Sequence, residues 1–230
     1  HMIIALERYY GPLAILITDS GEEAQMASID VIWQVWHENL QRAAMAVDRM
    51  MTLRLVSANT IVAWVFKTGT ICSSDDRYKY NFGWESLHVA VNKVIARVDD
   101  VRADIARIRQ DSPSDDADNR ISAKQEVLKE CERDVSETLV FVVKNFVQVI
   151  DDLFSANETM SSYSSLESID GVQGSTSKEN ILFFELLLFT KAFIRHYYQS
   201  IANCTAEIKK LAEGAKIPLT QSVIKSSLQV

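Results

Sequence analysis

Glycine and proline are scarce in this chain, which has seven glycines and three prolines among 230 residues. A sheet protein of this length needs many turns, and turns rely heavily on both residue types. Their scarcity therefore predicts long helices joined by few loops, which is an all-α fold. The chain is long enough for one large domain, and its hydrophobic content of 47% is too high for a disordered segment.

Cysteines are few and scattered. Cys72, Cys131 and Cys204 lie far apart in the sequence, and no two of them form a CxxC pair. An odd number of dispersed cysteines suits neither a disulfide framework nor a zinc site. We therefore expect buried thiols that act as small hydrophobic side chains in a reducing compartment.

Metal-ligand and catalytic signatures are also missing. The motif HExxH does not occur, and the single pair Glu85-x-x-His88 would bind metal only if a facing helix repeated it. His37 and His196 have no ligand at helical spacing on a shared face. We predict no metal, no cofactor and no catalytic residue. The sequence leaves open an enzyme site assembled from distant residues, such as a Ser-His-Asp or Cys-His arrangement.

Dense runs of lysine or arginine are absent, and the formal net charge is -7. This balance disfavours direct binding to a phosphate backbone, which needs a basic face, and favours a protein that meets other proteins. Asp99-Asp100 and the acidic stretch at residues 115–118 lack the glycine and closing glutamate of a calcium loop. We expect both acidic stretches to be solvated surface.

Long apolar runs are missing as well. The most apolar stretch, residues 181–189, is interrupted by Glu185 and is too short to cross a bilayer. No signal peptide is visible, and no membrane partner is expected. His1-Met2 resembles an expression remnant, from which we expect a domain taken from a longer chain.

Helical periodicity is what the chain does contain. Apolar spacing predicts helices over residues 3–18, 20–37, 41–53 and 57–66, and later over 177–213 and from 220. Ser20 with Glu23, and Thr176 with Glu179, form capping-box patterns. The expected inward-facing residues are Ile29, Ile32, Trp33, Trp36, Ala44, Val47, Met50 and Met51. Because the loops are short, successive helices are expected to pack antiparallel, as in a HEAT-like stacked helical repeat.

A heptad pattern marks the middle of the chain. Its apolar positions are Trp84, Leu87, Val91, Val94, Val98, Val101, Ile105 and Ile108, with charged residues between them. A polar break at residues 111–118 contains Pro113, and a second long helix is expected from about Ile121. Its apolar face is expected to be Leu128, Cys131, Val135, Leu139, Val142, Phe146, Val149 and Leu153.

The two long helices are expected to fold back on each other as an antiparallel coiled-coil hairpin. Its base near Trp84 and Phe146 would lie in the body, and residues 99–134 would form a protruding tip. Heptads that close on themselves predict a monomer, whereas a plain coiled-coil tether would dimerise through the hairpin. The Ser-rich segment at residues 155–175 is expected to be a flexible loop.

The chain has four tryptophans, Trp33, Trp36, Trp64 and Trp84, which are candidates for a base-stacking platform. All four fall at core spacing on apolar helix faces, where large aromatic side chains dominate packing. We therefore expect them to be structural.

Five segments carry a resemblance, in the same order along the chain. They are residues 31–41 (VIWQVWHENLQ), 47–52 (VDRMMT), 58–66 (ANTIVAWVF), 84–88 (WESLH) and, more loosely, 217–224 (IPLTQSVI). The series resembles the C-terminal helical domain of the large subunit of the nuclear cap-binding complex. That family also follows the fourth segment with a long charged helix, a polar break and a second long helix. The chain departs from the family at Leu40, where proline is usual, and in its extended Ser-rich loop.

The resemblance implies an architecture and a set of partners. Residues 1–230 would form a single domain of the middle-domain type, the third and C-terminal one of a longer chain. It would be a non-enzymatic scaffold that supports docking of a small cap-binding subunit, which is an RNA-recognition-motif protein, and of RNA-processing and export factors. Capped RNA would be bound only indirectly. The location would be nuclear, with shuttling to the cytoplasm.

The sequence does not fix which residues bind these partners. The candidates are the cations of the expected hairpin, Arg102, Arg107, Arg109, Lys124 and Lys129. One alternative is a middle-domain scaffold that docks an RNA helicase. The other is a helical enzyme whose site is not visible in the sequence.

Overall fold

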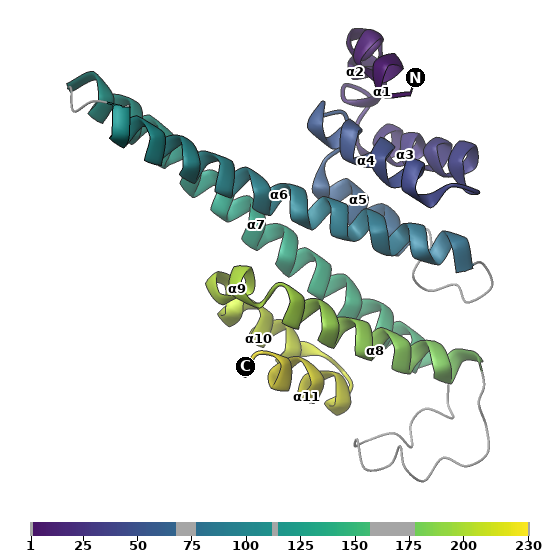
Figure 1. The fold of residues 1–230 in the computed structure, drawn as a ribbon. Helices are drawn as coiled ribbons and strands as arrows, with labels where there is room; N and C mark the ends of the chain where they lie inside the picture. The colour runs from purple at the N-terminus through teal and green to yellow at the C-terminus, as the bar shows by residue number, and fades with distance from the viewer. Residues whose placement is uncertain (1, 68–76, 112–114, 157–177, 230) are drawn as a thin grey trace. The chain divides into compact units, whose positions relative to one another are not determined.

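The computed structural model describes residues 2–67, 77–111, 115–156 and 178–229, and every regular element among them is a helix (Figure 1). The expected all-α fold is confirmed. The contacts between residues group into two compact units, His1–Thr138 and Leu139–Val230, each of which is described by itself.

The N-terminal segment forms two short helices, α1 (Met2–Arg8) and α2 (Tyr10–Ile17). The prediction of one helix over residues 3–18 is therefore wrong. Pro12 is the reason, since it has no backbone N–H to donate to the carbonyl of Arg8, and its ring clashes with that carbonyl in a continuous helix. The chain bends at Tyr9, whose own N–H still donates to Ala5 O at 3.0 Å.

Helix α3 (Glu22–Trp36) begins differently from the expected capping box. Gly21, not Ser20, occupies the N-cap, and no side chain caps the helix. Gly21 has a φ of 87°, a backbone conformation that only glycine adopts without strain. Glu22 and Glu23 in the first turn face the positive end of the helix dipole, which stabilises this end.

Helix α4 (Leu40–Thr52) is capped by Asn39, whose Oδ1 accepts a hydrogen bond from the Arg42 backbone N–H at 3.1 Å. Leu40 is thus the first helical residue, a position where proline is readily accommodated. The helix buries Ala43, Ala46, Val47 and Met50. The expected inward residues Ala44 and Met51 are only half-buried, because the buried stripe is rotated from the expected one.

Helix α5 (Ala58–Lys67) forms the centre of the first unit, and most of its side chains are buried. Trp64 is fully buried, and its Nε1 donates to Asp30 Oδ1 of α3 at 2.8 Å. Phe82 of α6 packs against both Trp64 and Trp33, with ring centroids 5.5 and 5.3 Å apart. These aromatic contacts join α3, α5 and α6.

Two long helices follow, α6 (Arg77–Asp111) and α7 (Asp115–Ala156). Every position of the heptad series in α6 is buried or half-buried, as the spacing predicts. Helix α7 begins six residues before the expected Ile121, so the acidic residues from Asp115 onward are helical rather than part of a loop. Aspartates in a first helical turn are favoured by the helix dipole, which accounts for the earlier start.

Within the first unit, α6 and the first part of α7 run antiparallel side by side (Figure 1). Arg102 donates to Glu132 at 2.7 Å, and Lys124 donates to Asp104 at 2.8 Å. Ile105 of α6 is buried, and Ile108 is half-buried.

The second unit contains the end of α7 and a set of shorter helices. These are α8 (Lys178–His196), α9 (Tyr198–Ile201), the 3₁₀ turn η3 (Ala202–Cys204), α10 (Thr205–Gly214) and α11 (Pro218–Ser227). The single helix expected over residues 177–213 is therefore wrong. Asn203, Cys204 and Thr205 are weak helix formers, and Thr205 Oγ1 donates to the carbonyls of Ile201 and Ala202.

Burial explains why the second unit breaks that helix. The break lets α10 and α11 return so that α11 packs on α8. Phe146 of α7 packs against Phe193 of α8, with ring centroids 5.9 Å apart. Asp151 of α7 is buried, and its carboxylate accepts the Lys216 backbone N–H at 3.1 Å. Of the loop expected at residues 155–175, Ser155 and Ala156 are the last residues of α7, and the remainder lies outside the described residues. Thr176 of the expected capping box also lies outside them, while Glu179 is in the first turn of α8.

Candidate functional site

The tryptophans do not form an open platform. Trp64 is fully buried, while Trp33, Trp36 and Trp84 are half-buried. Trp33 stacks on Phe82, and the Arg42 guanidinium lies 5.3 Å from the ring centre of Trp36. The structural role expected for these side chains is what their packing supports.

Potential metal ligands were the second kind of site considered from the sequence. Within residues 2–67, 77–111, 115–156 and 178–229, no group of three or more histidine, cysteine or carboxylate side chains is placed to bind one. Cys131 and Cys204 are buried as expected, and Cys72 lies outside the described residues. Burial raises the pKa of the Cys204 thiol to about 11, with a smaller contribution from Glu207. At neutral pH this thiol is therefore protonated and a poor nucleophile.

Across the described parts of the chain, no helix combines the length and the apolar character needed to span a bilayer. Ile181 and Leu188 of α8 are exposed, but Leu182, Phe183, Leu186 and Leu187 face the core of the second unit. The apolar stretch at residues 181–189 is therefore explained by packing.

Four of the five candidate hairpin cations are engaged by carboxylates. The pairs are Arg102 with Glu132 and Asp99, Arg107 with Asp104, Lys124 with Asp104, and Lys129 with Glu126. The Lys124 ammonium, through a hydrogen bond and its charge, lowers the pKa of the Asp104 carboxyl below the ordinary value. The hairpin surface is thus largely neutralised by its own residues.

Arg109 is the exception among these candidates. It is exposed, and the structure gives it no ion pair with any described residue. Together with Arg102, Ile105, Gln125 and Leu128 it borders a shallow hollow of about 230 Å³. Among the five candidates, Arg109 is therefore the one whose charge is not matched by a carboxylate of the described residues.

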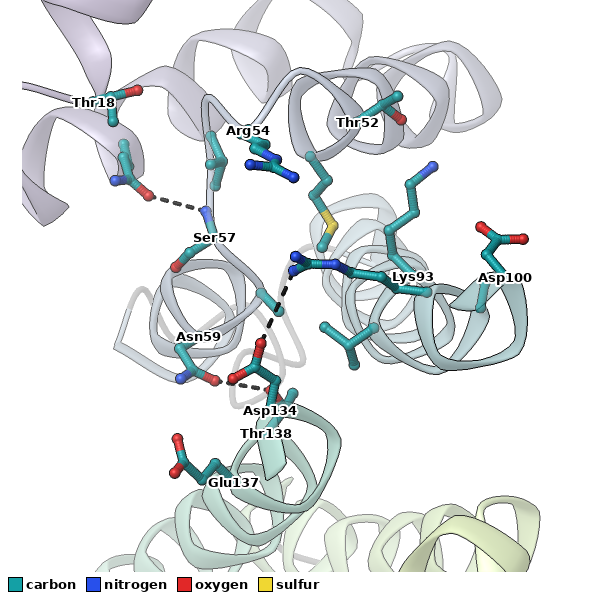
Figure 2. A pocket seen from close by; sticks show the side chains of 17 residues that line it. Thr18, Thr52, Arg54, Ser57, Asn59, Lys93, Asp100, Asp134, Glu137 and Thr138 are labelled. Atoms are coloured by element: carbon teal, nitrogen blue, oxygen red, sulfur yellow. Dashed lines mark hydrogen bonds and ion pairs between the residues drawn. The ribbon is translucent and has the colours of Figure 1, made fainter. Parts of the chain in front are cut away.

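A larger groove lies in the body of the first unit, and Figure 2 shows it from close by. Its volume is about 730 Å³, and its walls come from α3, the corner between α4 and α5, α6 and the first part of α7. Arg54 and Asp134 lie on opposite sides of the groove, and Lys93 and Asp100 lie on its α6 wall (Figure 2).

Hydrogen bonds between side chains and backbone hold the walls of this groove. Gln25 Oε1 of α3 accepts from the Ser57 backbone N–H and from the Thr60 hydroxyl, both at 3.0 Å. On the opposite wall, Thr138 Oγ1 donates to Asn59 Oδ1 at 3.2 Å. These bonds link α3, α5 and α7 around the groove and fix its shape.

The groove carries equal numbers of cations and carboxylates among its lining side chains. Lys93 donates to Asp48 at 2.8 Å, and Glu137 lies 3.5 Å from Arg133. Arg97 and Asp134 are 4.0 Å apart, at the outer limit of an ion pair. The two charged groups that remain in the lining are Arg54 and Asp100.

Arg54 and Asp100 are both exposed and form no ion pair with any described residue. Sequence reasoning missed Arg54, and it took Asp100 for plain solvated surface. The one signal for Arg54 is its position just after α4, where glycine or asparagine is usual. No spacing pattern could have brought Arg54 and Asp100 together, because the groove joins residues from five helices, α3 to α7.

Comparison with known proteins adds an independent finding. Residues 1–202 match the protein family described as MIF4G like. A protein of Arabidopsis thaliana named nuclear cap-binding protein subunit 1 is 36% identical over 108 residues, which cover 47% of this chain and 12% of that protein.

Two further proteins with the same name also match. The Oryza sativa subsp. japonica protein is 30% identical over 151 residues, 66% of this chain and 15% of its own length. The Gallus gallus protein is 21% identical over 177 residues, 69% of this chain and 22% of its own length. The chain thus spans less than a quarter of each of these relatives.

Proposed function

Because the chain belongs to the MIF4G-like family, we propose that it is a non-enzymatic scaffold domain of a nuclear cap-binding complex, within its large subunit. The observation that carries this proposal is the family match over residues 1–202, together with similarity to nuclear cap-binding protein subunit 1. Stacked helices suit such a role, since a rigid frame loses little conformational entropy when it binds.

The proposal has finer parts. The chain is the third, C-terminal helical-repeat domain of a longer protein, with residues 99–134 as a protruding coiled-coil tip and 155–175 as a flexible loop. It supports docking of the small cap-binding subunit and of RNA-processing factors, and it meets capped RNA only indirectly. It acts in the nucleus and shuttles to the cytoplasm. The order of matching segments along the sequence supports these parts.

The charge distribution favours protein partners over direct RNA binding. A net charge of -7 and a hairpin whose cations are mostly paired give no basic face for a phosphate backbone. Among the hairpin candidates, Arg109 is the best placed for a partner, since its guanidinium forms no ion pair with a carboxylate of the described residues.

Co-purification of the chain with the small cap-binding subunit of the same organism tests this proposal. We expect a stable complex. Loss of that complex when residues 101–133 are replaced by a short turn, which keeps Asp100 and Asp134 of the groove, would place the contact on the hairpin. Arg109→Glu is expected to weaken the complex, and Arg120→Glu is the matched control, because Arg120 is also exposed and without an ion pair. Failure of the unmodified chain to bind would contradict docking by this domain.

A scaffold that docks an RNA helicase is the alternative within the same fold. It predicts binding to a helicase and none to the small cap-binding subunit in the same assay. Light scattering on the isolated chain checks the expected monomer, whereas a dimer would indicate a coiled-coil tether.

A further inference from the structure

The groove in the first unit combines an unusual backbone position with an unpaired charge. Arg54 has a φ of 57°, in the left-handed region, and it is the only non-glycine residue in the described parts of the chain with a positive φ. A side chain there costs conformational energy that glycine would avoid. An arginine at such a position calls for a reason beyond local structure.

Two backbone hydrogen bonds hold Arg54 in the left-handed conformation. The N–H of Arg54 donates to Met51 O at 2.9 Å, and the N–H of Leu55 donates to Met50 O at 2.9 Å. This is the Schellman pattern that ends α4, with Met50 and Leu55 buried beneath it. The pattern fixes where the Arg54 side chain leaves the chain, and glycine in its place would keep every one of these bonds.

The guanidinium of Arg54 is aimed at the groove and has no carboxylate partner among the described residues (Figure 2). Asp100 lines the same groove from α6 and is likewise outside any ion pair. A polyanion such as RNA would meet the repulsion of Asp100, Asp134 and Glu137, and a bare cation would meet that of Arg54 and Arg97. A polypeptide segment is the ligand class that brings charges of both signs together with backbone amides.

We propose that this groove binds a segment of a partner protein, with an acidic side chain of the segment held by Arg54 and a basic one by Asp100. The groove volume of about 730 Å³ lies in the range of sites that enclose small ligands or short peptide segments. Asn59, which lines the groove, uses its Oδ1 to accept from Thr138, and its amide Nδ2 can donate to the segment's backbone. This inference rests on the proposed scaffold function and names the chemistry of one of its partners.

The test uses the full chain and three defined probes, followed by NMR of the amide and arginine Nε–H signals. The first probe is a ten-residue peptide with two glutamates at one end, two lysines at the other and a Gly-Ser spacer. The second has glutamine in place of every charged residue. The third is a ten-nucleotide oligouridylate. We expect the charged peptide to shift the signals of Arg54, Ser57 and Asn59, and the other two probes to leave them unchanged.

Arg54→Gly is the decisive variant, because removing the backbone strain should make the chain more stable while removing the guanidinium should weaken peptide binding. It should raise the melting temperature by about 2 to 4 °C, since it removes the left-handed strain, and weaken the charged peptide by about tenfold or more. Arg120→Gly, in the second turn of α7, should lower the melting temperature and leave peptide affinity unchanged. Arg54→Asn, which also tolerates this backbone, should behave like Arg54→Gly.

Several results would overturn the inference. Equal affinity of Arg54→Gly and the unmodified chain for the peptide would do so, as would the same signal shifts with oligouridylate, which would make this a phosphate site. Peptide shifts confined to residues outside the groove would also contradict it. If one of these three results is obtained while the small cap-binding subunit still co-purifies with the chain, the groove proposal is wrong and the proposed scaffold function is unaffected.

Discussion

The hairpin and the body of the first unit distribute their charges in opposite ways. On the hairpin, Arg102, Arg107, Lys124 and Lys129 are each held by carboxylates of the same surface. In the groove of the body, Arg54 and Asp100, which lies at the base of the hairpin, are exposed and form no ion pair with any described residue. A high density of charged residues in the sequence is therefore a poor guide to binding, because cations and carboxylates that pair with one another are already neutralised.

Stability differs between the two regions as well. The body is centred on a helix buried on most sides, whereas the outer hairpin buries a narrow stripe between two exposed faces. Trp64→Ala, Ile105→Ala and Lys124→Ala probe this contrast, and Asp151 of the second unit adds a comparison between two carboxylates. The largest effect is expected in the body.

Trp64→Ala should lower the free energy of unfolding by about 3 to 5 kcal/mol. The side chain is fully buried, packs against Phe82 and donates a hydrogen bond to Asp30, so its removal leaves a cavity and an unpaired carboxylate oxygen. Urea denaturation followed by circular dichroism gives the value. Trp36→Ala is the control, since that ring is only half-buried, and a loss as large as that of Trp64→Ala would refute the contrast.

Ile105→Ala, in the outer hairpin, should cost about 2 kcal/mol, at the lower end for a buried aliphatic residue. Ile105 is buried, but its neighbour Ile108 is half-buried and the surrounding positions are exposed, so the helices are free to close around the gap. Hydrogen exchange should show the loss of protection confined to α6 and the first part of α7. A loss of protection spread over α3 to α5 would show that the hairpin and body unfold together.

Asp151 and Asp104 form a contrast between a buried and an exposed carboxylate. Asp151→Ala should cost about 1 to 3 kcal/mol, because it leaves the part-buried Lys216 backbone N–H without an acceptor. Burial raises the pKa of Asp151, so the folded state binds the proton more tightly than the unfolded chain does. This group therefore makes the unfolding free energy fall as pH rises from the ordinary value of 3.8 through the folded value.

Asp151→Asn keeps an acceptor for Lys216 and cannot ionise, so it should remove that pH dependence at a smaller cost in stability. The measurement is the urea midpoint of Asp151→Asn and of the unmodified chain between about pH 3 and 7, a range that brackets the ordinary carboxyl pKa. An unchanged pH profile in Asp151→Asn would show that another group titrates.

Lys124→Ala should have the smallest effect. The ion pair with Asp104 is partly exposed, with about two fifths of each side chain open to solvent, so its contribution to stability is slight and screened by salt. The pair lowers the pKa of Asp104, so what it contributes is present above the ordinary carboxyl pKa and lost as pH falls through the lowered value. The urea midpoint should move slightly at low salt and not at about 1 M salt. A shift that survives high salt would mean that the pair is less exposed than it lies here.

Much of the fold could be predicted from the sequence, because helix periodicity is local. The bounds of α3, α4 and α5 and the heptad positions of α6 follow from apolar spacing. The errors have tertiary or backbone causes. Pro12 ends α1 through a clash that spacing does not register, and the break after His196 depends on where α11 packs. Propensity is a weak prior, and burial overrides it at such places.

The candidate site was predicted less well. The five candidate cations were recognisable from their charge, but which of them are engaged depends on the partner helix. Among these five, Arg109 alone has no ion pair with a described residue. The groove was missed because it joins Gln25, Arg54, Asp100 and Thr138, residues far apart in the sequence. A left-handed arginine is visible only once the backbone is known.

The mutual neutralisation of the hairpin has a consequence for association kinetics. Alternating charges largely cancel one another at a distance. Salt screens the remaining field over roughly 8 Å at physiological ionic strength. A partner would not be drawn to this surface by long-range attraction, and its arrival rate should lie near that of ordinary unsteered encounters and respond weakly to salt. Selectivity at the hairpin would then reside in how long a molecule stays rather than in how quickly it arrives.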